Sequence, residues 1–230
     1  MLRVNKILTI LMLFITVNSY AFVLNGTRYI YPESNNSISM TVRNNAAVLY
    51  GGQVWIENHS SVDDRVYFSV SPSLFRLNGG ESQLVRIFNV DDSLPKNRES
   101  LFYINAQEIP RLKESGESNE MMFAINTKVK LIYRPDAVKS KREDAEQNIK
   151  ITHVGNTTRL HNDTPYFFAI IEAYDETDKA IDINKYGLRD PLGTFAPGSS
   201  VDIPRKHSKL SIVSIGDYGE TKKYTLEVKE

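Results

Sequence analysis

The residue types that most often carry out chemistry are few and scattered in this sequence of 230 residues. Histidine occurs at four positions, none of which pairs with another at a metal-ligand spacing: His59, His153, His161 and His207. Cysteine is absent, which excludes disulfides, thiolate metal sites and cysteine nucleophiles. Neither a nucleophile elbow nor a phosphate-binding glycine loop occurs. We therefore expect no catalytic residues, no metal ion and no cofactor.

Two pairs of neighbouring carboxylates are the remaining candidates for acid–base chemistry: Asp63 with Asp64, and Asp91 with Asp92. We interpret them as solvated loop charges, because acid–base catalysis needs groups held within reach of a substrate. Two glycine pairs are predicted to form hairpin turns: Gly51 with Gly52, and Gly79 with Gly80. Basic and acidic residues number 28 each, so the basic surplus typical of nucleic-acid binding is missing.

One apolar stretch stands out as a binding candidate. Residues 121–133 read MMFAINTKVKLIY, and Pro135 ends the run. Alternate positions carry Met121, Phe123, Ile125, Thr127, Val129, Leu131 and Tyr133. This period of two predicts a β-strand with one apolar face. The face could pack into a core, or it could lie at a sheet edge and accept a partner strand. The alternation alone does not choose between these alternatives.

The rest of the chain predicts an all-β protein of two sandwich domains. About seven short strands separated by turn residues precede residue 135, a pattern typical of an immunoglobulin-like sandwich. A polar segment at 136–147 reads as a linker, and residues 148–230 repeat the strand-and-turn pattern in a smaller sandwich. We therefore predict one domain at 22–135 and another at 148–230. Convincing helical periodicity is absent.

The N-terminus resembles a secretory signal peptide. Arg3 and Lys6 precede an apolar run at 7–17, and Ser19 and Ala21 are small residues at the positions that a signal peptidase reads. We predict a signal peptide at 1–21, cleaved after Ala21. The run is shorter than the ~20 residues of a membrane-spanning helix, so we expect no membrane insertion of the mature chain.

Several motifs resemble the periplasmic fimbrial (pilus) chaperones of the PapD-like family. The first domain carries GTRYIYP at 26–32, QVW at 53–55, LPKNRES at 94–100 and KVKLIYRP at 128–135. The second domain matches more loosely, through HNDTPYFFAI at 161–170 and SIGDYGE at 214–220. The resemblance implies two immunoglobulin-like domains in an L or boomerang arrangement. It also implies a periplasmic location.

The resemblance implies a function in fimbrial assembly. Such a chaperone donates its last first-domain strand to incomplete fimbrial subunits and delivers them to an outer-membrane usher. Counting back from the KLIYRP motif places Met121, Phe123, Ile125 and Thr127 in this donor strand. A second copy of the chain is a further candidate partner for the same edge.

The resemblance also implies roles for charged residues. Arg28 and Lys130 correspond to the cations that bind the carboxyl terminus of the subunit, and Lys128 is a neighbour that could be confused with Lys130. Strict alternation puts Lys130 on the opposite face from Phe123 and Ile125, so a bulge or twist is expected to reconcile the two surfaces.

A second set of charged residues corresponds to a network between the domains of the family: Glu99, Arg134 and Asp217. We expect these three residues to fix the angle between the two domains.

Two other function classes compete with a chaperone. A structural fimbrial subunit or adhesin would usually be one incomplete domain, often with a cysteine pair. This chain has two apparently complete domains and no cysteine. A secreted enzyme on a β-sandwich would need a cluster of titratable groups. The modest loop at 111–120 and the absence of cysteine resemble the short-loop branch of the chaperone family.

Overall fold

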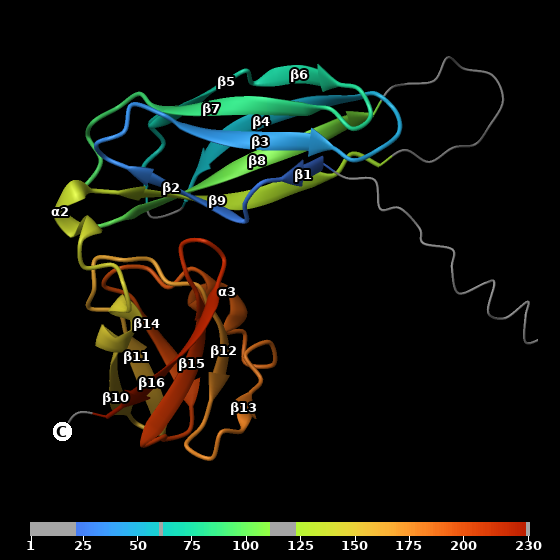
Figure 1. Cartoon of the computed structure of the whole chain (residues 1–230). Coiled ribbons are helices and arrows are strands. Elements are labelled where there is room, and N and C mark those ends of the chain that lie inside the picture. Colours follow the sequence, from blue (N-terminus) through green and yellow to red (C-terminus); the bar gives the residue numbers. More distant parts are fainter. Residues whose placement is uncertain (1–21, 60–61, 111–122, 229–230) are drawn as a thin grey trace, which may run out of the picture.

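The computed structural model describes residues 22–59, 62–110 and 123–228, and these form two β-sandwiches (Figure 1). The first sandwich lies across one end of the second, which gives the L arrangement (Figure 1). The predicted all-β class is confirmed. Within these ranges no helix is long and apolar enough to cross a membrane.

The first sandwich consists of a four-stranded and a five-stranded sheet. The four-stranded sheet has the order β1 (Phe22–Leu24), β3 (Ile38–Asn44), β7 (Ser82–Asn89) and β5 (Phe68–Ser71). The five-stranded sheet has the order β2 (Arg28–Pro32), β9 (Asn126–Arg134), β8 (Ser100–Pro110), β4 (Tyr50–Asn58) and β6 (Leu74–Leu77). All pairs are antiparallel except β2 with β9, which is parallel. The chain therefore changes sheets between β1 and β2, in the segment that contains Gly26.

The second sandwich has a three-stranded and a four-stranded sheet. Its strands are β10 (Lys150–Val154), β11 (Thr157–His161), β14 (Ser200–Pro204) in one sheet and β13 (Ala180–Ile181), β12 (Ile170–Tyr174), β15 (Lys209–Ile215), β16 (Thr221–Glu227) in the other. Short helices that the sequence did not predict are α2 (Asp136–Lys139), α3 (Arg189–Gly193) and the 3-10 turn η1 (Ala145–Asn148). They are too short to show a helical period, which explains why the pattern missed them.

Each sandwich has its own core, and a smaller cluster joins them. Met40, Val42, Val85 and Ile87 alternate with outward residues along β3 and β7, as half-buried strands require. The predicted linker at 136–147 does not lie free, because it contributes Val138 and Ala145 to the second core. The joining cluster consists of Leu101, Ile132 and Phe167.

The prediction for one glycine pair was wrong. Gly51 and Gly52 lie inside β4, paired with both β8 and β6, and not in a hairpin turn. A Cβ on Gly52 would stand 2.4 Å from the Phe75 ring and 2.8 Å from the Phe22 ring, so glycine is needed here for close packing. Gly79 and Gly80 do form a turn, but it joins β6 to β7 in the other sheet and is not a hairpin.

The predicted strand at 121–133 is shorter than expected. It begins at Asn126, and residues 123–125 lie outside any strand, although the carbonyl of Ile125 still accepts a hydrogen bond from the Glu108 amide at 2.9 Å. Met121 and the loop at 111–120 lie outside the described residues. Pairing of β9 with β8 runs without a register shift, so the expected bulge is absent.

Candidate functional site

Strand β9 is paired along nearly its whole length on one side and along about half its length on the other. β8 pairs with residues 126–133, whereas β2 begins at Arg28, opposite Lys130. Since the Ile125 carbonyl points toward β8, the alternation of an extended strand turns the backbone groups of Asn126 and Lys128 to the other side. Within the described chain, no strand pairs with that side before Lys130. The first half of β9 is therefore an open sheet edge.

The apolar face of the β9 stretch divides at the same place. Leu131 and Tyr133 are buried in the first core, and Val129 packs against it. Phe123 and Ile125 extend beyond the core and are 69% and 41% exposed. Both alternatives for the apolar row therefore apply. The second half of the row is part of the core, and the first half lies exposed at the sheet edge.

Two cations lie side by side where β2 meets β9. Arg28 and Lys130 are register partners in the parallel pair. The Arg28 guanidinium donates to the Ile215 carbonyl at 2.8 Å, and the Lys130 ammonium donates to the Gly193 carbonyl. Among the described residues neither cation has a carboxylate within ion-pair distance, and the buried Nε of Arg28 has no hydrogen-bond acceptor. Neither cation therefore has a direct ion pair, although Asp217, Glu220 and Glu146 lie near enough to Arg28 to oppose the lowering of its pKa by burial.

Burial and charge repulsion both lower the pKa of Lys130. Burial lowers the pKa of Lys130 to about 8, and the neighbouring Arg28 adds to this shift. An anion bound between the two cations would oppose both effects, because it restores a favourable partner for each charge.

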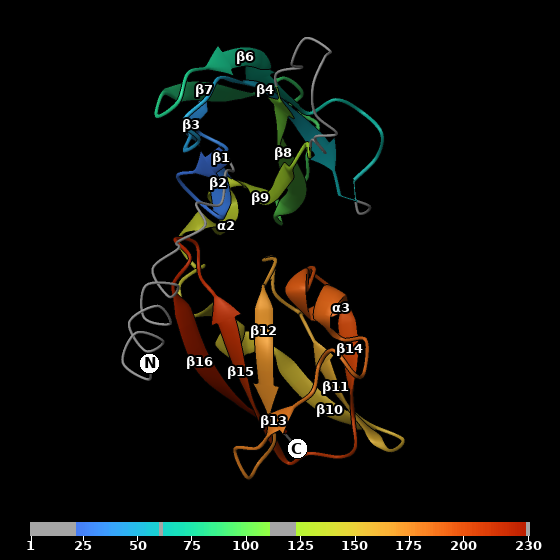
Figure 2. The same ribbon diagram turned by 90° about the vertical axis from the view of Figure 1, so that its right-hand side faces the viewer.

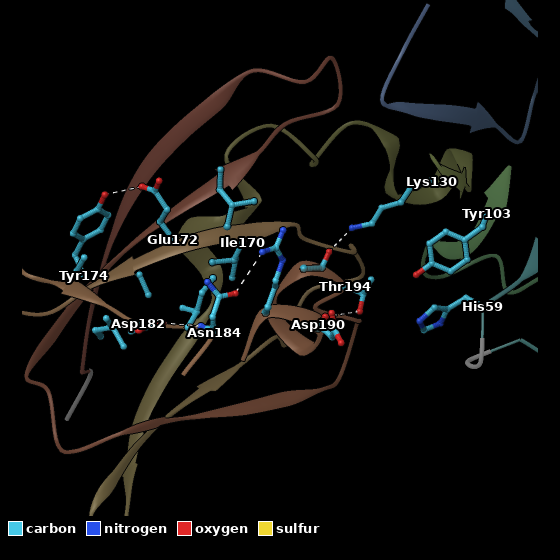
Figure 3. Close-up of a pocket in the computed structure, with 17 residues that line it drawn as sticks. His59, Tyr103, Lys130, Ile170, Glu172, Tyr174, Asp182, Asn184, Asp190 and Thr194 are labelled. Atoms are coloured by element: carbon cyan, nitrogen blue, oxygen red, sulfur yellow. Dashed lines mark hydrogen bonds between the residues drawn. The ribbon is translucent and has the colours of Figure 1, made fainter. Parts of the chain in front are cut away.

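A cleft beside Lys130 separates the two domains. It has a volume of about 760 Å³. Figure 3 shows His59, Tyr103 and Lys130 on one wall, and Asp190 and Thr194 near α3 on the other. Figure 2 shows that α3 and one end of β12 lie on the side of the second sandwich that faces the first. The second domain therefore forms the wall of the cleft that lies opposite Lys130.

Lys128 is distinguished from Lys130 by its contacts. Its ammonium lies 2.9 Å from the Glu57 carboxylate and 4.3 Å from the centre of the Tyr103 ring. Its charge is thus already paired on the sheet surface. Lys130 and Lys128 share the face of β9 opposite Thr127, and this face turns toward the second domain at the Lys130 end. The apolar row of Phe123 and Ile125 and the cation Lys130 therefore lie on the two opposite faces of one strand, and no bulge is needed to place them.

The predicted charge network is brought together at the domain junction. Arg134 donates from Nε to Glu99 at 2.6 Å and from its two terminal nitrogens to Asp217 at 2.5 and 2.9 Å. Glu99 also accepts from the Phe167 amide at 2.8 Å. Burial raises the pKa of Asp217, but the Arg134 guanidinium outweighs this and holds the pKa below its ordinary value. Arg134 therefore bridges a carboxylate from each domain.

Sequence reasoning missed several residues at this junction. Arg142 forms a bidentate pair with Glu146 at 2.9 and 3.0 Å, and both are buried although they come from the predicted linker. Their spacing of four residues was the available signal. Gly193 and Ile215 act through their backbone carbonyls, which no residue type reveals.

Two family models match the chain. Residues 21–139 match the model described as "Pili and flagellar-assembly chaperone, PapD N-terminal domain". Residues 144–226 match "Pili assembly chaperone PapD, C-terminal domain". Together they cover most of the sequence and follow the two sandwiches.

Relatives named as chaperones match over nearly the full length. The Escherichia coli chaperone protein FanE is 41% identical over 227 residues, which cover 97% of this chain and 98% of the relative. The Escherichia coli chaperone protein FaeE is 35% identical over 212 residues, covering 91% and 80%. These matches favour a chaperone over a fimbrial subunit or adhesin.

Solved structures show the same fold. The Escherichia coli chaperone DraB superimposes with a TM-score of 0.75 at 26% identity, covering 92% of this chain and 98% of that one. A Salmonella enterica structure of SafA pilin in complex with the SafB chaperone matches with a TM-score of 0.77 at 24% identity, covering 93% and 99%. The chain therefore belongs to the PapD-like family of pilus assembly chaperones, a class of binding proteins and not of enzymes.

Proposed function

We propose that this chaperone binds fimbrial subunits by strand addition at the open edge of β9, with the carboxyl terminus of the subunit held by Arg28 and Lys130. The observation that carries the proposal is the coincidence of three features at one place. These are an unpaired backbone edge, exposed apolar side chains, and two cations that form no ion pair with any described carboxylate.

The open edge supports strand addition for two physical reasons. The backbone groups of Asn126 and Lys128 can pair with an incoming strand, and each buried group that is left unpaired would cost about 1–3 kcal/mol. Phe123 and Ile125 can enter the core of an incomplete subunit, and burial stabilises by roughly 25 cal/mol per Å² of apolar area. Thr127 continues this row, and Met121 would extend it. The same edge is open to a second copy of the chain, and self-association remains a prediction.

The cation pair would fix the register of the bound strand. A carboxylate between Arg28 and Lys130 accepts charge-assisted hydrogen bonds, which are about twice as strong as neutral ones. The anchor lies at the point where β2 takes over the edge, so a strand held there runs along the open half of β9. We assign this role to Lys130 and not to Lys128, because Lys128 is paired with Glu57 on the sheet surface.

Export and delivery complete the proposed function. The signal peptide at 1–21 would take the chain to the periplasm, where an outer-membrane usher would receive the chaperone–subunit complex. We propose that Glu99, Arg134 and Asp217 hold the two domains at the angle that keeps the cleft open, because Arg134 contacts both carboxylates. No cofactor takes part.

Loss of either anchoring cation should abolish the complex. Co-expression in a bacterial periplasm with a candidate subunit from the same locus should give a soluble one-to-one complex, and Arg28→Ala or Lys130→Ala should lose it. Each charge-assisted contact contributes about 1.5–3 kcal/mol, or at least about tenfold in affinity. Lys128→Ala serves as the control and should keep the complex. If the Arg28→Ala and Lys130→Ala variants bind as the wild type does, the anchor is misassigned.

Carboxylate binding should weaken above pH 8. Burial lowers the pKa of Lys130 to about 8, so the ammonium is charged at pH 7 and mostly neutral at pH 9.5. The affinity for a peptide with the free carboxyl terminus of a subunit should fall by up to about tenfold per pH unit above that pKa. Calorimetric titration measures this, with Lys130→Arg as the control that stays charged. Equal pH profiles for the two proteins would contradict the role of Lys130.

Removing the charge of Asp217 should loosen the domain junction. Asp217→Asn leaves the buried Arg134 with one carboxylate, and we expect a loss of about 2 kcal/mol in the free energy of unfolding. Small-angle scattering should also show a changed domain angle. Asp163→Asn is the matched control, because Asp163 and Lys150 form an exposed pair that contributes less than about 1 kcal/mol. Unchanged scattering and an unchanged free energy of unfolding would contradict the role of Asp217 in fixing the domain angle.

A further inference from the structure

Glu108 is a buried carboxylate that the proposed function does not use. It lies on β8, on the side of the five-stranded sheet that faces the core, and is 3% exposed. Within the described chain its side chain has one hydrogen-bond partner, the backbone nitrogen of Phe22. Phe22 begins β1 in the other sheet, so this bond connects the two sheets of the first sandwich.

Phe22 is held in place independently of this bond. Its side chain is 4% exposed, and its ring stacks on Phe75 at 6.3 Å and lies edge-on to Tyr50 at 6.4 Å. The absence of a side chain at Gly52 provides the space for the ring, and Gly52 is the register partner of Glu108. The backbone nitrogen of Phe22 is therefore fixed beside the carboxylate.

A single amide is a poor partner for a buried carboxylate. Burial raises the pKa of Glu108, and the Phe22 N–H opposes this shift to a smaller extent. Removing one charge from water costs several kcal/mol unless an opposite charge compensates it. A backbone amide supplies one neutral donor, whereas an α-ammonium supplies a full positive charge and three donors. The site thus fits an amino terminus better than an internal amide.

We propose that the peptide bond between Ala21 and Phe22 is cleaved, and that the new α-ammonium of Phe22 forms a buried ion pair with Glu108 across the sandwich. A peptidase of the export machinery adds water across this bond. Ala21 keeps the carboxylate, and the amine of Phe22 takes up a proton. Ser19 and Ala21 supply the small residues that such an enzyme reads.

The ion pair couples processing to the stability of the open edge. The amide of Glu108 donates to the Ile125 carbonyl at 2.9 Å, at the point where the exposed apolar segment joins the sheet. In an uncleaved precursor Phe22 has no α-ammonium, so the buried Glu108 carboxylate has no positive charge beside it. The first domain therefore reaches its full stability only after the leader is removed.

The test combines the two partners of the ion pair. One chain begins at Phe22 after periplasmic export, which intact mass must verify. A second chain carries one additional Met before Phe22, which displaces the ammonium by one residue at the same net charge. Each is made with and without Glu108→Gln. With Glu108 intact, the chain beginning at Phe22 should melt about 5 °C higher than the extended chain. In the Glu108→Gln background this difference should disappear.

Other results would overturn the proposal. These are a mature chain that begins elsewhere, equal melting of the two chains with Glu108 intact, or the same difference in both backgrounds. Glu143→Gln, at an exposed site, is the matched control and should preserve the difference. If Glu108→Gln does not fold, acylation of the α-amine gives a second readout. The amine should react more slowly in the native chain than in the unfolded one, and equal rates would overturn the ion pair.

Discussion

Strand β2 pairs with only part of β9, and the rest of the structure depends on this constraint. β2 pairs with β9 only from Lys130 onward, because the chain crosses from the other sheet between Leu24 and Arg28. A β-sandwich normally avoids a long open edge with apolar neighbours, since it invites association. Here the crossing leaves such an edge at residues 126–129 and places two cations at its end. The same local geometry thus creates both parts of the proposed binding site.

The second domain gives this edge its chemical context. It touches each cation through a backbone carbonyl, from Ile215 on one side and Gly193 on the other, and none of its described carboxylates lies within ion-pair distance of either cation. A carbonyl orients a cation without cancelling its charge, so the pair remains available to an anion. The bridge from Arg134 to Asp217 and the apolar contact of Phe167 hold this domain in place. We therefore propose that the junction is part of the binding site as well as a connection between the domains.

Much of this could be predicted from the sequence. Alternation and turn residues predict nearly every strand. Motif resemblance singles out Arg28 and Lys130 and the three residues of the charge network, and the structure brings each set together. The start of β9 and the strand position of Gly51 and Gly52 were not predictable, because both depend on packing against distant strands. The contact of Lys130 with the backbone carbonyl of Gly193 could not be predicted, because every residue type has such a carbonyl. The pairing of Glu108 with Phe22 links positions that are 86 residues apart, which no local pattern reveals.

Hydrogen exchange at β9 tests the central claim most directly. The amides of Asn126 and Lys128 face the open edge, whereas the second half of the strand is covered by β2. In the free protein we expect fast exchange at these two amides and slow exchange at residues 130–134. In a one-to-one complex with a fimbrial subunit, Asn126 and Lys128 should slow by about tenfold or more. If the complex forms and these amides exchange as fast as before, the subunit does not add a strand at this edge.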